Sequence, residues 1–374
     1  MTRDSLHIAL AAGGTGGHLF SAIALAEVLL ARHHQVSVLT DRRGARFGTN
    51  IQMRSVPATR LKGGLIGKVA GAFRLAAGVV SAAWHLKRDR CQLLVGFGGY
   101  PSVPPVLAAK LQGIPIILVE QNAVLGRANS RLARWAQTVA TAFPKVEKLG
   151  TTSHHFTGIP VRPAVVAARS EAYQPSVDEG RFQLLVFGGS QGAHVFADVV
   201  PQACALLPGN LRRRLQVTQQ TRPEDEFSVR STYAELGICA HIATFFDDLP
   251  AHMSKSHLVI ARAGASTIAE VLTIGRPAVL VPYPHAMDDH QTENARAIDA
   301  AGAAWLMPQT AFTPEALAGR LKTLLTLPDC AAQRAATAFK LGRPDAADSL
   351  ADLAESMLQA PAPEPKTLLR SVAS

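Results

Sequence analysis

The chain has 374 residues, of which 48% are hydrophobic and 18% are charged. This balance excludes an intrinsically disordered protein, and the length exceeds what one hydrophobic core usually supports, so we expect two domains. The four cysteines lie far apart and form no CxxC pair, which argues against a zinc site and a disulfide scaffold and is typical of a reducing cytosolic interior.

The net charge of +10 is concentrated in the first half of the chain. Residues 1–160 hold 19 Lys and Arg against 6 Asp and Glu, whereas residues 161–374 hold 19 against 22. This asymmetry favours contact with a polyanionic surface, either nucleic acid or an anionic bilayer, and a charge that only maintains solubility is the alternative. The first residues lack the basic, apolar and cleavage regions of a signal peptide, so we expect none.

A glycine turn follows the first predicted strand. Apolar residues at 7–12 precede the run GGTGGH at 13–18, and an apolar-periodic segment follows. This order predicts a strand, a turn and a helix start, where backbone N–H groups can face an anion. His18 is a candidate phosphate ligand or general base, and a polar cap of the helix is the alternative.

The same turn leaves a nicotinamide cofactor as an alternative. Leu19 occupies the third glycine position of the dinucleotide fingerprint, so the match is incomplete. Asp41 nevertheless ends the next strand, where a ribose-binding acid would lie, and Arg42 and Arg43 would suit a 2′-phosphate.

The segment 63–90 is a candidate membrane-surface helix. Its apolar residues recur at helical spacing and Lys or Arg flanks both ends; these apolar residues are Ile66, Val69, Phe73, Val80 and Trp84. Its longest apolar piece is too short to span a bilayer, but a basic cluster can hold a helix at an anionic surface. An amphipathic helix packed on its own sheet is the alternative.

Short apolar runs alternate with helical patterns along the whole chain, which predicts parallel sheets with crossover helices. The predicted strands are 7–12, 35–39, 91–95, 115–119 and 138–143, then 183–187, 214–218, 241–245, 257–261 and 278–282. The Pro-bounded stretch GIPVRP at 158–163 connects the two series. We therefore expect domains at 1–160 and 161–358, with the last helix a candidate to pack back on the first domain, and a loose tail at 359–374.

The second half repeats the glycine turn and adds a polar cluster. GGSQGA at 188–193 follows a strand and suits a pyrophosphate, and RAGASTIAE at 262–270 again places small residues before a helix. Glu270 can accept two hydrogen bonds from a ribose diol, although complementing the helix dipole is the alternative. The next strand ends in HAMDDHQTENA, which offers His290 and Gln291 to sugar hydroxyls.

Eight motifs in a fixed order resemble the MurG family, the UDP-N-acetylglucosamine:undecaprenyl-pyrophosphoryl-MurNAc-pentapeptide N-acetylglucosaminyltransferases of peptidoglycan synthesis. The motifs are GGTGGH, GFGGYPSVPP, EQNAVLGRAN, GIPVRP, VFGGSQGA, FFDD, RAGASTIAE and PYPHAMDDHQTENA, and the resemblance covers residues 1–358. It implies a GT-B fold, an α/β architecture in which two Rossmann-like domains face a central cleft. The N-terminal domain would bind the acceptor and the membrane, and the C-terminal domain would bind UDP-GlcNAc.

The resemblance also implies a reaction and its residues. GlcNAc would pass from UDP-GlcNAc to the C4 hydroxyl of MurNAc in lipid I, with inversion, to give lipid II. Residues assigned to UDP-GlcNAc are Thr15, Gly16, Gly17, Asn122, Arg162, Ser190, Phe246, Ala265, Ser266, Thr267, Ile268, Ala269, Glu270, His290 and Gln291. Phe246 would meet the uracil through its backbone. His18 is the first candidate for the base and Glu120 the second.

Two positions depart from the family pattern. Ser21 stands where proline is usual after the glycine-His motif, and Val119 stands where a histidine often precedes EQN. The second change removes a titratable group near the cleft. We expect neither a cofactor nor a metal, because the acidic pairs Asp247–Asp248 and Asp288–Asp289 are better placed to cap or orient than to chelate.

The expected partners are UDP-GlcNAc, lipid I and the anionic cytoplasmic face of the bacterial inner membrane, with peripheral attachment and no nucleic acid. Proteins of cell-wall synthesis are further candidate partners. A UDP-GlcNAc epimerase would share the fold and donor site without needing a basic acceptor face. A nicotinamide oxidoreductase would leave RAGASTIAE unexplained, and a non-catalytic lipid- or nucleic-acid-binding module would explain only the charge.

Overall fold

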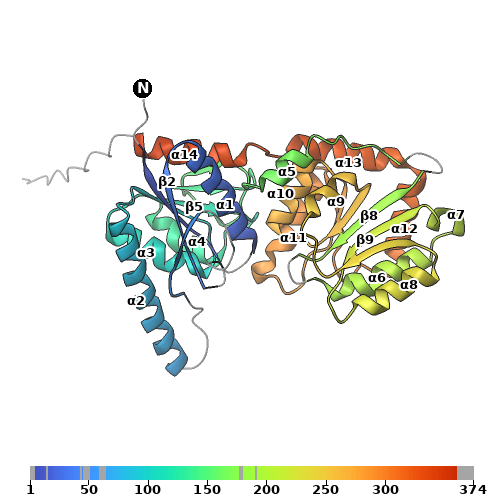
Figure 1. Cartoon of the computed structure of the whole chain (residues 1–374), viewed down its shortest axis with the longest axis horizontal. Helices are drawn as coiled ribbons and strands as arrows, with labels where there is room; N and C mark the ends of the chain where they lie inside the picture. Colours follow the sequence, from blue (N-terminus) through green and yellow to red (C-terminus); the bar gives the residue numbers. More distant parts are fainter. Residues whose placement is uncertain are drawn as a thin grey trace, which may run out of the picture.

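The computed structural model describes residues 5–13, 16–42, 44, 51–58, 65–176, 180–189 and 192–359. Two α/β units lie side by side, each built on one parallel sheet (Figure 1). The predicted fold class is confirmed, since all strand pairs between named strands are parallel. The central strands are buried on both faces, which is why they appear in the sequence as continuous apolar runs.

The N-terminal sheet has seven strands in the order β3-β2-β1-β4-β5-β6-β7. The strands are β1 (His7–Ala11), β2 (Gln35–Thr40), β3 (Gln52–Ser55), β4 (Leu93–Gly96), β5 (Ile116–Glu120), β6 (Thr138–Thr141) and β7 (His154–Phe156). The helical elements are α1 (Gly16–Ala31), α2 (Leu65–Arg88), η2 (Tyr100–Ser102), α3 (Val103–Leu111), α4 (Arg127–Leu132) and η3 (Ala133–Trp135).

The C-terminal sheet has six strands in the order β10-β9-β8-β11-β12-β13. The strands are β8 (Phe182–Phe187), β9 (Leu215–Gln220), β10 (Cys239–Ala243), β11 (Leu258–Ala261), β12 (Ala278–Leu280) and β13 (Ala304–Leu306). The helical elements are α5 (Pro163–Ala168), α6 (His194–Ala205), α7 (Gly209–Arg212), α8 (Glu226–Glu235), α9 (Leu249–Lys255), α10 (Ala265–Ile274), η4 (Met287–Asp289), α11 (His290–Ala300), α12 (Pro314–Thr326) and α13 (Pro328–Leu341).

In each sheet, the direction in which successive strands are added reverses at one point. The reversal lies between β1 and β4 in the first sheet and between β8 and β11 in the second. Ligands of open α/β sheets bind outside the carboxyl ends of the strands at such switch points. The loops that follow β1, β8 and β11 are the glycine-containing segments singled out in the sequence, so the topology places them where ligands bind.

The last helix, α14 (Ala346–Gln359), crosses back to the N-terminal sheet and packs on α1 (Figure 1). Leu350, Ala351 and Ala354 complete the apolar core beneath β1. Arg32, directly after α1, forms ion pairs with Asp348 at 2.8 Å and with Asp352 at 2.6 Å. This helix therefore joins the two units a second time, in addition to the connection near residue 160.

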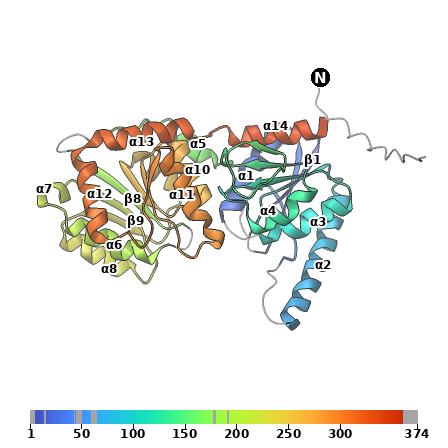
Figure 2. The same ribbon diagram turned by 180° about the vertical axis from the view of Figure 1, so that it is seen from behind.

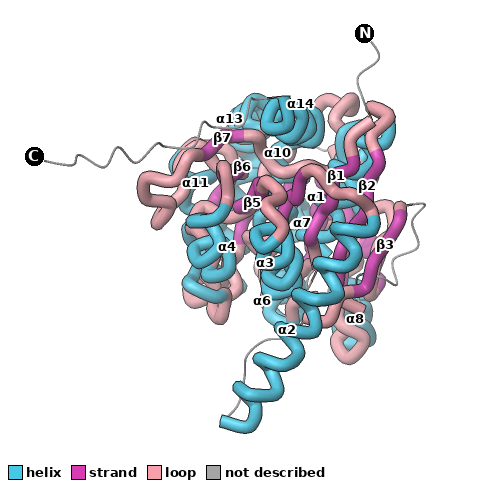
Figure 3. Tube along the Cα trace, turned by 90° about the vertical axis from the view of Figure 1, so that its left-hand side faces the viewer, coloured by secondary structure: helices cyan, strands magenta, loops and turns pink. Residues whose placement is uncertain are grey.

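Helix α2 projects away from the body of the N-terminal unit, as Figures 2 and 3 show from two further sides. Its second half packs on α3, with Ala82 and Leu86 buried, while Phe73 is 73% exposed. Contrary to the expectation from the sequence that its apolar part is too short, a span within α2, Val69–Arg88, is long and apolar enough to cross a membrane by length and composition alone. One face of this span packs on the protein, whereas the apolar side chains on the rest of its surface are exposed to solvent.

Candidate active site

The two units meet where α1 and α10 begin. A Cβ placed on Gly17 would lie 2.5 Å from Oγ of Ser266, so the start of α1 lies directly against the start of α10. Gly264 caps α10 without a side-chain hydrogen bond to the helix. Free backbone N–H groups and the positive end of the helix dipole therefore point toward the junction, an arrangement that suits an anion.

His18 is enclosed beside the turn that follows β4. A Cβ on Gly99 would lie 3.2 Å from Nδ1 of His18, and this nitrogen is buried with no hydrogen-bond partner among the described residues. Burial lowers the pKa of His18 to about 4; a hydrogen bond with the Gly13 backbone opposes this shift, and the nearby His290 adds to it. The imidazole is therefore neutral at pH 7 and has a nitrogen free to accept a proton.

Arg162 links three elements at the junction. Its Nη2 donates to Oε1 of Glu270 at 3.0 Å, and its guanidinium lies 5.2 Å from the centre of the Phe20 ring on α1. Burial raises the pKa of Glu270, and the charge of Arg162 opposes that shift. The sequence placed both residues at the donor; the structure brings them together, and their roles toward UDP-GlcNAc stay predictions.

Glu120 is engaged on both of its carboxylate oxygens. Oε1 accepts from the backbone and side-chain nitrogens of Asn122 at 2.9 and 3.1 Å, and Oε2 accepts from Gly126 N and Asn129 Nδ2, both at 2.9 Å. The side chain is almost fully buried. These contacts favour a role in shaping the loop 121–129 over proton abstraction, since both carboxylate oxygens are already engaged by residues of that loop.

Asn294 on α11 is a residue that sequence reasoning missed. It is fully buried. Its Oδ1 accepts from Ala123 N at 2.8 Å, and its Nδ2 donates to Asn122 Oδ1 at 3.1 Å and to Ala263 O at 3.2 Å. One amide thus joins the EQN loop of the first unit to the RAGAS loop of the second. Its signal in the sequence was an amide on the apolar side of an otherwise polar helix.

The first turn of α11 carries the other polar candidates. Oε1 of Gln291 accepts from Tyr283 N at 2.9 Å, and Nδ1 of His290 lies 2.6 Å from Met287 O. Asp288 and Asp289 adopt left-handed backbone angles, with φ of 54° and 51°. His290 and Gln291 therefore begin α11 directly after these two aspartates.

The remaining predicted residues lie in the C-terminal unit, at the helix starts, or outside the described part. Phe246 follows β10 and is buried, with its ring edge-on to His241 and His252. Thr15 and Ser190 fall outside the described residues. Gly16 begins α1, and Ala265, Thr267, Ile268 and Ala269 lie at the start of α10, where Ile268 packs into the apolar core of the C-terminal unit.

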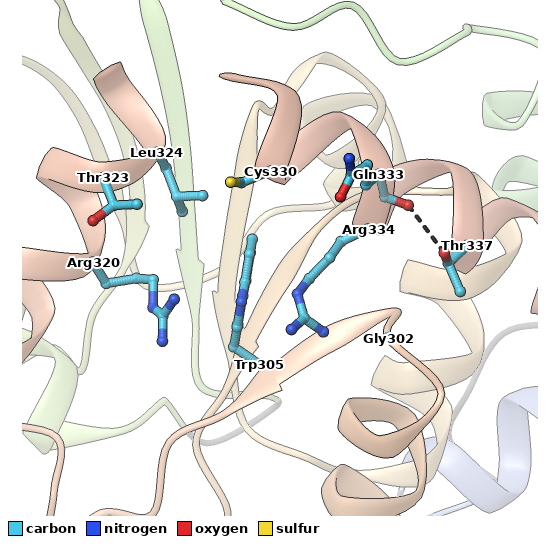
Figure 4. A pocket seen from close by; sticks show the side chains of 9 residues that line it. All are labelled: Gly302, Trp305, Arg320, Thr323, Leu324, Cys330, Gln333, Arg334 and Thr337. Atoms are coloured by element: carbon cyan, nitrogen blue, oxygen red, sulfur yellow. Dashed lines mark hydrogen bonds between the residues drawn. The ribbon is translucent and has the colours of Figure 1, made fainter. Parts of the chain in front are cut away.

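A separate pocket of about 340 Å³ lies far from this junction, between β13, α12 and α13 (Figure 4). Arg320 and Arg334 flank the Trp305 ring at 5.3 and 4.5 Å from its centre. Arg334 also hydrogen-bonds Ala304 O on this edge strand. The pocket contains none of the predicted site residues, and its arginines shield a sheet edge. Within the described ranges, no three His, Cys, Asp or Glu side chains gather as a metal site requires.

Comparison with known proteins agrees with this geometry. Residues 8–141 match the glycosyltransferase family 28 N-terminal domain, and residues 183–350 match the family 28 C-terminal domain. A Rhodospirillum centenum protein named UDP-N-acetylglucosamine--N-acetylmuramyl-(pentapeptide) pyrophosphoryl-undecaprenol N-acetylglucosamine transferase is 52% identical, covering 92% of this chain and 93% of its own. A Zymomonas mobilis protein of the same name is 47% identical, covering 92% and 91%.

Solved structures point the same way. The crystal structure of Acinetobacter baumannii MurG is 31% identical, covers 94% of this chain and all of its own, and superposes with a TM-score of 0.77. A UDP-GlcNAc 2-epimerase from Neisseria meningitidis reaches a TM-score of 0.66 at 13% identity, covering 95% of this chain and all of its own, which shows a shared fold alone. The paired family 28 domains and the extent of identity to its relatives show that this chain belongs to the MurG family of glycosyltransferases.

Proposed function

We propose that this protein transfers GlcNAc from UDP-GlcNAc to the C4 hydroxyl of MurNAc in lipid I, giving lipid II with inversion at the anomeric carbon. The names of its relatives describe an N-acetylglucosamine transferase acting on the undecaprenyl-pyrophosphoryl muramyl pentapeptide. The observation that carries the proposal is the contact of Gly17 with Ser266, which apposes an acceptor-side glycine turn and a donor-side helix start.

The leaving group can be stabilised by backbone dipoles. As the C4 oxygen bonds to the anomeric carbon, the bond from that carbon to UDP breaks and the departing diphosphate gains negative charge. The N-terminus of α10 offers unsatisfied N–H groups to this charge. Fixed dipoles of this kind need no rearrangement during the reaction and supply transition-state stabilisation.

The acceptor proton needs a base, and His18 is the better of the two candidates. Its neutral imidazole has a free nitrogen, whereas the carboxylate of Glu120 is saturated by hydrogen bonds. A pKa of about 4 makes His18 a weak base in the unliganded protein. A bound diphosphate would raise this pKa, because nearby negative charge favours the imidazolium.

The alternatives are not favoured. Asp41, the acid that a nicotinamide ribose would require, is buried and accepts hydrogen bonds from Gly44 N and the Tyr100 hydroxyl, both at 3.0 Å. The Asp41 carboxylate is therefore already engaged by hydrogen bonds within the protein. The UDP-GlcNAc 2-epimerases that share the architecture are 12 to 14% identical to this chain, a likeness that shows the fold alone.

Peripheral attachment to the cytoplasmic face of the inner membrane belongs to the same proposal. On α2 the apolar residues Val69, Phe73, Val80 and Trp84 are all at least half exposed and recur on one face. Arg74, Lys87 and Arg88 accompany them. An apolar face bordered by cations is suited to an anionic bilayer surface. Because Ala82 and Leu86 are buried against the protein, we propose that α2 lies on the membrane and does not cross it.

The test is transfer of label from radiolabelled UDP-GlcNAc to a lipid I analogue, followed by chromatography of the lipid product. We expect labelled disaccharide lipid that requires both substrates. Conversion of UDP-GlcNAc to its epimer without lipid I, or NAD(P)H oxidation, would replace the proposal with one of the alternatives. Absence of any turnover with intact lipid I would contradict it.

A further inference from the structure

Arg127 and Asp288 form a two-pronged ion pair between the units. Nε of Arg127 lies 3.1 and 2.8 Å from the two carboxylate oxygens of Asp288, and Nη2 lies 2.7 Å from Oδ1. Arg127 is the first residue of α4, and Asp288 belongs to η4 just ahead of α11. A fork that meets both oxygens restricts orientation as well as distance.

The backbone at Asp288 has an uncommon shape. Asp288 and Asp289 are consecutive non-glycine residues with positive φ. Such residues are uncommon, although aspartate tolerates the left-handed region better than most, and they persist where their surroundings hold them. Oδ1 of Asp289 accepts from the Thr292 hydroxyl at 2.7 Å, within the same segment. The contact that holds Asp288 comes from the other unit.

The ion pair lies between two loops that carry predicted site residues. On one side, Asn129 of the Arg127 helix donates to Glu120 at 2.9 Å. On the other, Asp288 precedes His290 and Gln291, and Gln291 is fixed to Tyr283 N. A shift of Asp288 would therefore move the segment that presents Gln291 relative to the EQN loop.

We propose that Arg127 and Asp288 are positioning residues for the donor. Their mutual contact holds the segment 287–291 in place against the N-terminal unit. This inference rests on the proposed function. Neither residue needs to touch the reacting atoms. Arg127 is largely exposed, so salt should screen the pair and weaken its effect.

A double-mutant cycle tests the coupling. Arg127→Gln, Asp288→Asn and the double variant are compared for KM and kcat toward UDP-GlcNAc at low salt with a saturating lipid I analogue. We expect each single variant to raise KM by about 2- to 5-fold with little change in kcat, and the double variant to be no worse than either. The increase should vanish at about 1 M salt.

The matched control is the pair Glu293 and Arg296, which also joins an acid to an arginine but lies wholly on α11. Glu293→Gln and Arg296→Gln should leave KM unchanged. The reversed pair, Arg127→Asp with Asp288→Arg, should recover part of the lost affinity. Strictly additive effects of the two single variants, or equal effects of the control variants, would overturn the inference.

Hydrogen exchange gives a readout that does not depend on transfer. The Tyr283 amide is held by Gln291, so Asp288→Asn should speed its exchange several-fold, while amides of β11 keep their rates. If the wild-type protein fails to transfer GlcNAc but the Tyr283 amide exchanges faster in Asp288→Asn, the proposed function is wrong. The structural role of the Arg127–Asp288 pair is then still supported. If transfer succeeds and neither KM nor exchange responds to the variants, the inference alone fails.

Discussion

Gly17 lies so close to Ser266 that a Cβ on Gly17 would stand 2.5 Å from the Ser266 hydroxyl oxygen. The two residues are about 250 positions apart in the chain, and each lies in the first turn of the helix that follows a strand at the switch point of its sheet. At this point the backbone of α1 lies directly against a side chain of α10. A ligand entering here would meet both helix starts at once.

Gly17→Ala should disturb this apposition more than the fold. Overpacking of this kind costs about 1–3 kcal/mol, which corresponds to about a 5- to 150-fold loss in UDP-GlcNAc affinity if the observed arrangement binds the donor. Removing the Ser266 hydroxyl leaves a Cβ contact of 3.4 Å, which is ordinary. The double variant Gly17→Ala with Ser266→Ala should therefore bind better than Gly17→Ala alone, measured by titration calorimetry. Ser266→Ala alone serves as the reference for the effect of removing the hydroxyl. If the double variant binds no better than Gly17→Ala, the Ser266 hydroxyl is not what opposes the added methyl group.

His18→Ala should lower kcat by about 10²- to 10⁴-fold at saturating substrates if His18 is the base. The folded-state pKa of about 4 is below the ordinary value of 6.5, so the group favours the unfolded state as pH falls from 6.5 toward 4. His18→Gln should accordingly lose less stability than the wild type between pH 7.5 and pH 5 in urea unfolding. Near-normal turnover of His18→Ala would remove the base assignment.

Glu270→Ala should weaken UDP binding by about 10- to 100-fold, because loss of a buried hydrogen-bonding carboxylate leaves its partners unpaired. The control is Glu315→Ala, since Glu315 is a helical glutamate on α12 that is exposed and away from the junction. Glu270 lies beyond the first turn of α10, where the helix dipole acts most strongly. Equal binding of UDP by the wild type, Glu270→Ala and Glu315→Ala would leave Glu270 only its ion pair with Arg162.

Asn294→Ala should destabilise the contact between the units. The substitution leaves the Ala123 N–H and the Ala263 carbonyl without their hydrogen-bond partner. Each such group lowers the free energy of unfolding by about 1–3 kcal/mol. We expect a lower unfolding midpoint in urea and separation of the two units into distinct transitions. Arg296→Ala, on the exposed side of the same helix, should change stability by no more than about 0.5 kcal/mol. A midpoint unchanged by Asn294→Ala would contradict the role of this amide.

Phe73→Ser and Trp84→Ser should reduce binding to vesicles rich in anionic lipid, by sedimentation, by about fivefold or more each. Burying one large apolar side chain is worth about 1.5–3 kcal/mol. Phe227→Ser is the matched control, because Phe227 is also strongly exposed but lies on α8 of the C-terminal unit. Vesicle binding that does not change with salt concentration would count against membrane attachment through α2. An equal loss of vesicle binding with Phe227→Ser would count against it as well.

Local sequence patterns located the central strands and their turns with small errors at the boundaries. They missed β3, β7 and β13, which lie at sheet edges. The residues of β3 and β7 are partly or wholly exposed, and β13 is only three residues long, so none of them shows a long apolar run. Edge strands need cover on fewer sides, and their pairing depends on a neighbour that is distant in sequence.

The glycine turns, the order of motifs and the charge asymmetry are properties of the sequence by itself, because apolar periodicity and glycine spacing act over a few residues. Other outcomes were decided only by tertiary structure. Glu120 is saturated by its own loop, Asp41 is occupied by Tyr100, and α14 returns to the first unit. Asn294 joins the units through bonds spanning more than 170 residues. Whether a polar side chain is free or engaged depends on such long-range partners, and no local pattern encodes them.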